Sequence, residues 1–316
     1  MKMYKKLISF IVLGFIIMYI GFIYTEYATP QKNHRVFGVT YMTMNNPFYK
    51  IINNEILKIV EKNNDRLITL DPALDIEKQN EQIYKFIENG VDGIFINPIN
   101  FEAIEPALQA AKDANIPVIV IDAPVGNEQL AKCTIVSDNY NAGVACAKDM
   151  MKRMDKANII LLKHTTAKSA KDRIDGFIDV IKDNNQYKII NEAECEGQLE
   201  IAMPKLKKML KETPDVDVIM ALNDPSALGA VAALEKDNRN DVIVYGIDGT
   251  PDVKSMINNK SIIVGTVAQS PIKMGQIAGE KMYEVLNGHD IESNIIIPVY
   301  LITKENISNY DEKRWQ

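Results

Sequence analysis

Short apolar runs of strand length alternate with helical patterns through most of the chain, and this alternation limits the fold more than any other feature. Helical spacing is clear, for example, in Ile76, Ile83, Phe86 and Ile87, which precede the helix-ending Gly90. The strand-length runs are residues 36–42, 67–70, 93–96, 118–121, 158–162, 188–190, 216–222, 242–247 and 262–267. Most are apolar throughout, which is typical of parallel strands covered by helices on both faces. The sequence therefore predicts an α/β fold with two doubly wound parallel-sheet lobes.

Length and charge narrow the class of protein further. The 316 residues suggest roughly two domains, and 47% hydrophobic with 25% charged residues is ordinary globular composition. The net charge of −6 gives no reason to expect a nucleic-acid partner. Three scattered cysteines fit neither a redox pair nor a zinc site. Cys133 and Cys146 are expected to pack as small buried side chains, with a disulfide between them as the alternative.

The N-terminal segment has the pattern of a membrane anchor. Lys2, Lys5 and Lys6 precede an uncharged apolar run over residues 7–24. At helical rise this run covers about 27 Å, close to the thickness of the hydrocarbon core, and the basic flank predicts a cytoplasmic N-terminus. We therefore expect residues 1–30 to form a cytoplasmic tip, a transmembrane signal anchor and a stalk, with the rest of the chain outside the cytoplasm. A cleavable signal peptide is the alternative, although no small-x-small site follows the run.

Polar side chains follow several of the predicted strands where each strand ends. In open α/β sheets ligands bind beyond the carboxyl ends of the strands, so these residues are the first candidates for a site. They are Asn46 after the first run, Asp122, Asn223, Asp248 and Gln269. Each taken alone is also a good helix cap or turn residue. Their recurrence at successive strand ends favours a shared binding site.

This set of side chains suits an uncharged sugar. A carboxylate accepts hydrogen bonds from two neighbouring hydroxyl groups, and an amide both donates and accepts. Phe48 and Tyr49 follow the amide pair after Pro47 and provide rings for the C–H face of a sugar, with packing at the start of a helix as the alternative.

Eight short segments make the chain resemble the class I periplasmic sugar-binding proteins of the ribose-binding type. The segments are Asn45-Asn46-Pro47-Phe48-Tyr49, Ile96-Asn97-Pro98, Ile121-Asp122, Ser137-Asp138-Asn139, Arg173-Ile174-Asp175-Gly176-Phe177, Ala221-Leu222-Asn223-Asp224, Gly246-Ile247-Asp248-Gly249-Thr250-Pro251 and Ala268-Gln269. They occur in the family's order over residues 36 to about 304.

The resemblance implies two lobes that are joined by three crossing segments and close on the ligand. It implies an N-terminal lobe of residues 35–137 plus 270–297 and a C-terminal lobe of residues 138–269 plus 298–316. The implied sugar contacts are Asn46, Phe48, Tyr49, Asp122, Arg173, Asn223, Asp248 and Gln269. Arg173 supplies a guanidinium fork that can serve two hydroxyl oxygens.

Two departures argue against ribose itself. Ala123 stands where ribose binders carry an arginine, and Glu196-Gly197 lies where they place an aromatic residue. The resemblance with these departures points to another pentose, a hexose or a polyol, with Glu196 as an additional acceptor.

Other classes of function have less support. No phosphate-binding loop, nucleophile elbow, zinc-protease motif or calcium loop is present, and the three histidines are isolated, so we expect neither an enzyme nor a cofactor or metal. A sugar-responsive repressor would need a DNA-binding motif where the apolar run stands. The expected role is either delivery of a sugar to an ABC permease in the same membrane or ligand sensing, and the sequence supports the two about equally. The alternative is an accessory subunit that reports sugar to a membrane histidine kinase, for which the short stalk would keep partners close.

Overall fold

The computed structural model describes residues 14–20 and 34–316. Residues 36–316 form one compact unit, and residues 14–20 are helical. Most of the apolar run at residues 7–24 lies outside the described residues, so the structure does not test the predicted membrane anchor. Among the helices that the structure describes, none has the length and apolar character needed to cross a membrane.

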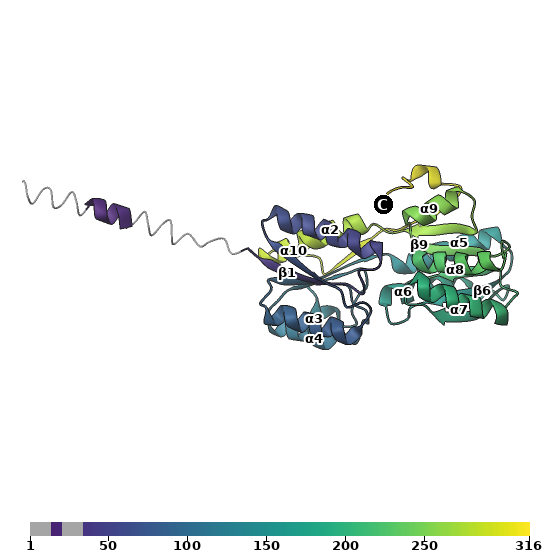
Figure 1. Cartoon of the computed structure of the whole chain (residues 1–316), viewed down its shortest axis with the longest axis horizontal. Helices are drawn as coiled ribbons and strands as arrows, with labels where there is room; N and C mark the ends of the chain where they lie inside the picture. The colour runs from purple at the N-terminus through teal and green to yellow at the C-terminus, as the bar shows by residue number, and fades with distance from the viewer. Residues whose placement is uncertain (1–13, 21–33) are drawn as a thin grey trace, which may run out of the picture. The chain divides into compact units, whose positions relative to one another are not determined.

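The first lobe is built on a six-stranded parallel sheet (Figure 1). Its strand order is β11 (Asn294–Ile297), β5 (Cys133–Ser137), β4 (Val118–Ile121), β3 (Gly93–Ile96), β1 (Val36–Thr40) and β2 (Arg66–Leu70). Helices α2 (Pro47–Lys62) and α10 (Pro271–Leu286) pack together on one face, and α3 (Ile76–Glu88) and α4 (Glu105–Asp113) pack together on the other. A short 3-10 turn covers Glu128–Leu130.

The second lobe repeats this plan. Its sheet has the order β12 (Tyr300–Thr303), β10 (Ile263–Ala268), β9 (Ile243–Asp248), β8 (Val218–Ala221), β6 (Ala157–Lys163) and β7 (Tyr187–Glu194). Helices α5 (Asn139–Arg153) and α6 (Lys168–Ile181) form one packed pair, and α7 (Leu199–Glu212) and α8 (Asp224–Lys236) form another. Helix α9 (Pro251–Asn258) contacts the 3-10 turn at Ile307–Asn309.

The chain passes between the two sheets three times. It leaves the first sheet after β5, returns to it after β10 through α10, and leaves it again between β11 and β12. The structure therefore has the two-lobed α/β architecture that the alternation of strand and helix predicts.

Several details differ from the sequence-based expectation. The second sheet is not wholly parallel, because β12 runs antiparallel to β10. Strand β7 extends well beyond the predicted residues 188–190, and the predicted strand at residues 216–222 is limited to Val218–Ala221. Strands β5, β11 and β12 were not predicted. Strands β11 and β12 are short, partly exposed edge strands on either side of Pro298, although apolar residues make up most of each.

Apolar side chains fill the space between each sheet and its helices. The largest fully buried side chains include Phe37, Phe95, Phe177 and Tyr245. The three cysteines are buried and free, so the alternative disulfide between Cys133 and Cys146 is not formed.

Helices α5 and α6 approach each other closely through two glycines. A Cβ atom at Gly143 would lie 1.8 Å from the carbonyl oxygen of Arg173, and one at Gly176 would lie 2.1 Å from that of Tyr140. Both obstacles are main-chain atoms, which cannot move aside as a flexible side chain can. These glycines therefore set the position of α6, the helix that carries Arg173.

We expect Gly176→Ala to destabilise the fold by about 1 to 3 kcal/mol, because the added methyl group forces α5 and α6 apart. Urea unfolding followed by circular dichroism measures the change. Lys171→Ala is the matched control on the exposed side of the same helix, and it should stay within about 0.5 kcal/mol of the parent. Equal unfolding midpoints for Gly176→Ala and the parent would contradict this close packing.

Candidate functional site

Two buried carboxylates lie at the carboxyl ends of one strand from each sheet. Asp122 follows β4 in the first lobe, and Asp248 ends β9 in the second. Their φ angles are 68° and 149°, a region that residues other than glycine rarely adopt. Such backbone conformations persist where the surrounding structure holds them, often at binding sites. Both side chains line the same cavity.

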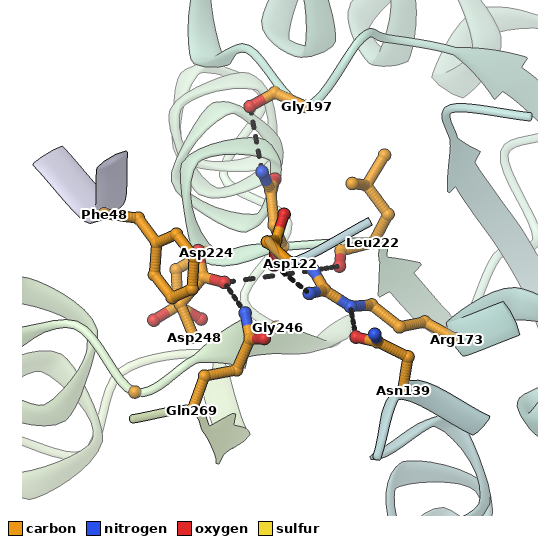
Figure 2. Close-up of polar contacts among 12 residues, drawn as sticks. Phe48, Asp122, Asn139, Arg173, Gly197, Leu222, Asp224, Gly246, Asp248 and Gln269 are labelled. Carbon is orange, nitrogen blue, oxygen red and sulfur yellow. Dashed lines mark hydrogen bonds and ion pairs between the residues drawn. The ribbon is translucent and has the colours of Figure 1, made fainter. Parts of the chain in front are cut away.

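The guanidinium of Arg173 is directed toward both carboxylates (Figure 2). Its Nε donates to Asn139 Oδ1 at 2.8 Å, and its Nη1 donates to the carbonyl oxygen of Leu222 at 3.0 Å. It also lies 3.9 Å from Asp122 Oδ1 and 3.9 Å from Asp248 Oδ1. Two hydrogen bonds within the second lobe therefore hold Arg173 in place, while its charge faces the carboxylate of the first lobe.

Each carboxylate has one oxygen with a hydrogen-bond partner and one without. The hydroxyl of Tyr49 and the amide of Asn97 donate to Asp122 Oδ2 at 3.4 and 3.2 Å, and Gln269 Nε2 donates to Asp248 Oδ1 at 2.7 Å. Among the described residues, Asp122 Oδ1, Asp248 Oδ2 and Gln269 Oε1 are buried without any hydrogen-bond partner. An amide oxygen accepts only, and so do the oxygens of an ionised carboxylate, so the cavity is suited to an occupant that donates.

A third carboxylate adds to the charge of the site. Asp224 is fully buried, and it accepts hydrogen bonds from Thr266 Oγ1 at 2.6 Å and from the amide of Thr250 at 2.7 Å. Burial raises the pKa of Asp224 and of Asp122. Burial, together with the nearby charge of Asp224, raises the pKa of Asp248 well above its ordinary value, against the opposing effect of Arg173. Ionisation of these three carboxyl groups therefore costs free energy in the folded chain.

All eight side chains predicted from the sequence line one cavity between the lobes. The space between the atoms of its walls, including its open mouth, is about 450 Å³. None of the eight lies on a separate surface. The predicted residues are Asn46, Phe48, Tyr49, Asp122, Arg173, Asn223, Asp248 and Gln269.

The two asparagines also act as helix caps, so the simpler interpretation of their role holds as well. Asn46 Oδ1 accepts from the amide of Phe48 at the start of α2. Asn223 Oδ1 accepts from the amide of Ser226 at the start of α8, and its Nδ2 donates to the carbonyl oxygen of Gly197 at 3.0 Å. The side-chain amide of Asn223 therefore already has partners at both ends.

The two aromatic residues differ in what they contact. Tyr49 stacks on Tyr41, with ring centroids 5.7 Å apart, and its hydroxyl is directed to Asp122. Phe48 is 2% exposed and meets Trp315 edge to face at 5.7 Å. Both rings line the cavity while they pack at the start of α2. The packing and site interpretations are therefore not exclusive.

Sequence reasoning did not assign several residues that shape this site. Asn139 orients Arg173, and Asn97 donates to Asp122. The charge of Asp224 raises the pKa of Asp248. The signal for these was present, since all three belong to the segments that carry the family resemblance. His164 is 7% exposed and lines the cavity, and burial lowers its pKa. Glu196 lies exposed at the edge of the cavity.

Comparison with known proteins gives consistent matches over nearly the whole compact unit. A family model described as a periplasmic binding protein domain matches residues 37–290. The ribose import binding protein RbsB of Bacillus subtilis is 27% identical over 89% of this chain and 92% of its own length. The D-apiose import binding protein of Paraburkholderia graminis is 28% identical over 92% and 93% of the two chains.

A solved structure agrees with these matches. An ABC transporter solute binding protein from Mycobacterium smegmatis, crystallised with bound glycerol, has a TM-score of 0.83 and 27% sequence identity. The similarity covers 88% of this chain and 96% of that one.

We expect Asp248→Asn to raise the stability of the ligand-free protein at pH 7. The pKa of Asp248 is higher in the folded chain than in the unfolded one, so ionisation of this group costs folding free energy as the pH rises above its unfolded pKa of about 3.9. The gain from Asp248→Asn should therefore be largest near neutral pH and should shrink toward pH 4. Urea unfolding at several pH values measures it.

Asp179→Asn is the control for this experiment. Asp179 is exposed, and hydrogen bonds from Lys182 and Tyr140 lower its pKa, so its removal should give no gain at pH 7. An Asp248→Asn variant that is less stable than the parent at neutral pH, with the gap unchanged at pH 4, would contradict the electrostatic cost assigned to this carboxyl group.

Proposed function

The chain belongs to the periplasmic binding protein family, and on that premise we propose that its cavity binds an uncharged monosaccharide or polyol without chemical turnover. The observation that carries the proposal is a set of three buried acceptors that have no hydrogen-bond partner among the residues that the structure describes: Asp122 Oδ1, Asp248 Oδ2 and Gln269 Oε1. Buried polar groups are normally satisfied, so an occupant that donates several hydrogen bonds fits this cavity best. Sugars and polyols carry closely spaced hydroxyl donors.

The rest of the cavity supports the same class of ligand. Arg173 offers N–H groups to hydroxyl oxygens, since an arginine fork donates only. Phe48 and Tyr49 supply apolar ring surface for the C–H groups of a sugar. None of these contacts requires the catalytic residues of a hydrolase or transferase. We propose that the protein is not an enzyme.

The absence of an arginine side chain at position 123 narrows the choice among sugars. Ala123 is buried and follows Asp122 at the place where ribose binders have an arginine. The relatives are named for different small sugars, ribose and D-apiose, so ligand identity varies among similar chains. We propose a pentose other than ribose, a hexose or a polyol.

Binding is proposed to close the two lobes on the ligand. Contacts between the lobes include the approach of Arg173 to Asp122, a hydrogen bond from Asn45 to Glu200 at 3.3 Å, and one from the amide of Phe101 to the carbonyl of Thr166 at 3.4 Å. A sugar that contacts both lobes favours this closed form over an open one. The moving units are proposed to be residues 35–137 plus 270–297 and residues 138–269 plus 298–316.

The family membership places the binding domain outside the cytoplasm. We propose that the apolar run at residues 7–24 anchors it to the membrane, on the grounds of its length and basic flank. Relatives named as import binding proteins favour delivery of sugar to an ABC permease. The alternative, a report to a membrane histidine kinase, rests on the short stalk at residues 25–34.

A thermal-shift panel of pentoses, hexoses and polyols on the full chain tests the proposed ligand class. A ligand at a hundred times its dissociation constant should add about 2.7 kcal/mol to the free energy of unfolding. Sugar phosphates are the control, because three buried carboxylates disfavour an anion. A panel in which sugar phosphates alone raise the melting temperature would refute an uncharged ligand.

For the sugar found in that panel, Asp248→Ala should weaken binding about 5- to 150-fold, corresponding to about 1 to 3 kcal/mol. Tyr49→Phe should lose less affinity, because the hydroxyl of Tyr49 already donates to Asp122 within the protein. Asp252→Ala, on the exposed side of α9, is the matched control and should bind like the parent. Titration calorimetry measures all three. A larger loss for Tyr49→Phe than for Asp248→Ala would remove Asp248 from the site.

A further inference from the structure

The segment after β12, residues 304–316, is held on the second lobe by a buried lysine. Lys254 on α9 is fully buried, and its Nζ donates to the main-chain oxygens of Asp311, at 2.5 Å, and of Arg314. An ammonium group taken out of water needs such partners. The side chain of Asn258, also on α9, donates to Glu312 at 2.7 Å. Helix α9 therefore fixes the path of this segment.

The residue that follows this attachment contacts the other lobe. The ring of Trp315 meets that of Phe48 edge to face, with centroids 5.7 Å apart and an interplanar angle of 62°. Phe48 belongs to the first turn of α2 in the first lobe, and its ring lines the sugar cavity. Figure 1 draws the C-terminal end of the chain between α2 and α9, and Figure 2 shows the ring of Phe48 beside Asp248 and Gln269.

We propose that residues 304–316 form an interlobe strap, in which Trp315 holds Phe48 and favours the closed form of the cleft. One end of the strap is fixed to the second lobe by Lys254, and the other packs on the first lobe. The inference rests on the proposed closing motion: separation of the lobes would part the Trp315 and Phe48 rings. Trp315 does not line the cavity, so it is a positioning residue and makes no direct contact with sugar.

The strap differs from the hydrogen bonds between the lobes because its contact with the first lobe is apolar. The hydrogen bonds from Asn45 to Glu200 and from Phe101 to Thr166 join polar groups that water can satisfy equally well when the cleft opens. Opening at Trp315 exposes apolar ring surface on both partners instead. The strap also acts on a ring that faces the ligand, so it joins lobe closure to the arrangement of the cavity wall.

An aromatic pair contributes enough to change a two-state equilibrium by about 2- to 12-fold. Loss of the Trp315 ring should therefore lower the ratio of closed to open molecules by about this factor. The apparent affinity for a sugar should fall by a similar factor when the open form predominates.

The test uses ligand-free protein, so it does not depend on the identity of the sugar. Trp315 is the single tryptophan of the chain, so tryptophan fluorescence reports on the surroundings of this ring. In the full-length parent, acrylamide should quench Trp315 severalfold less than it quenches N-acetyltryptophanamide. Phe48→Leu and Lys254→Met should each increase the quenching, since one removes the packing partner and the other removes the Lys254 attachment of the strap to α9.

Tyr300→Leu is the matched control, because Tyr300 is an exposed aromatic residue of β12. It should leave the quenching of Trp315 unchanged. Since Lys254→Met removes a buried group, its melting temperature is measured alongside, and Phe48→Leu decides the result if Lys254→Met does not fold. Small-angle scattering should also show a larger radius of gyration for Trp315→Ala than for Trp315→Phe.

The strap is refuted if Trp315 in the parent is quenched like the free indole compound, or if Phe48→Leu leaves its quenching unchanged. Equal radii of gyration for the parent, Trp315→Ala and Trp315→Phe would exclude an effect on closure. Failure of every sugar in the thermal-shift panel would count against the proposed ligand and not against the strap, so the two outcomes are separable.

Discussion

The buried guanidinium of Arg173 is the interaction on which the arrangement of the cleft depends. It is the positive charge that faces Asp122 from the opposite lobe and Asp248 from its own. Charges removed from water are tolerated when they are paired and hydrogen-bonded, and a buried charge that loses its partner is costly. The close packing of α5 on α6, the amide of Asn139 and the carbonyl of Leu222 together fix the guanidinium at this point.

This electrostatic arrangement leaves the empty cavity incompletely satisfied. One arginine faces the buried carboxyl groups of Asp122 and Asp248, and Asp224 is buried as a third. Acceptor atoms of Asp122, Asp248 and Gln269 have no hydrogen-bond partners among the described residues. A site of this kind gains binding energy from groups that cost stability in the free protein, a trade-off common to functional sites. The left-handed backbone at Asp122 has the same origin, because the turn after β4 is shaped to present a carboxylate and not to minimise strain.

Much of the fold and the site could be predicted because the signals are local. Apolar runs mark the central strands, and polar residues that follow them, such as Asp122 and Asp248, meet at one edge by the geometry of parallel sheets. Strand β12 shows the limit of that reasoning: nothing within Tyr300–Thr303 specifies its direction, which depends on the path from β11. Likewise, Arg173 came from the family resemblance, and its pairing with Asn139 depends on how two helices pack, which no local pattern encodes.

The place of β11 in the first sheet has a consequence for biosynthesis. Strand β5 pairs with β11, so Thr134 finds its neighbour Asn294 only after nearly the whole chain has been made. Until then the growing polypeptide carries an open sheet edge, and its first lobe remains unfinished while the second is being synthesised. Long-range pairing of this kind slows folding. Strands β6 to β10 of the second sheet can therefore pair before the first sheet is complete.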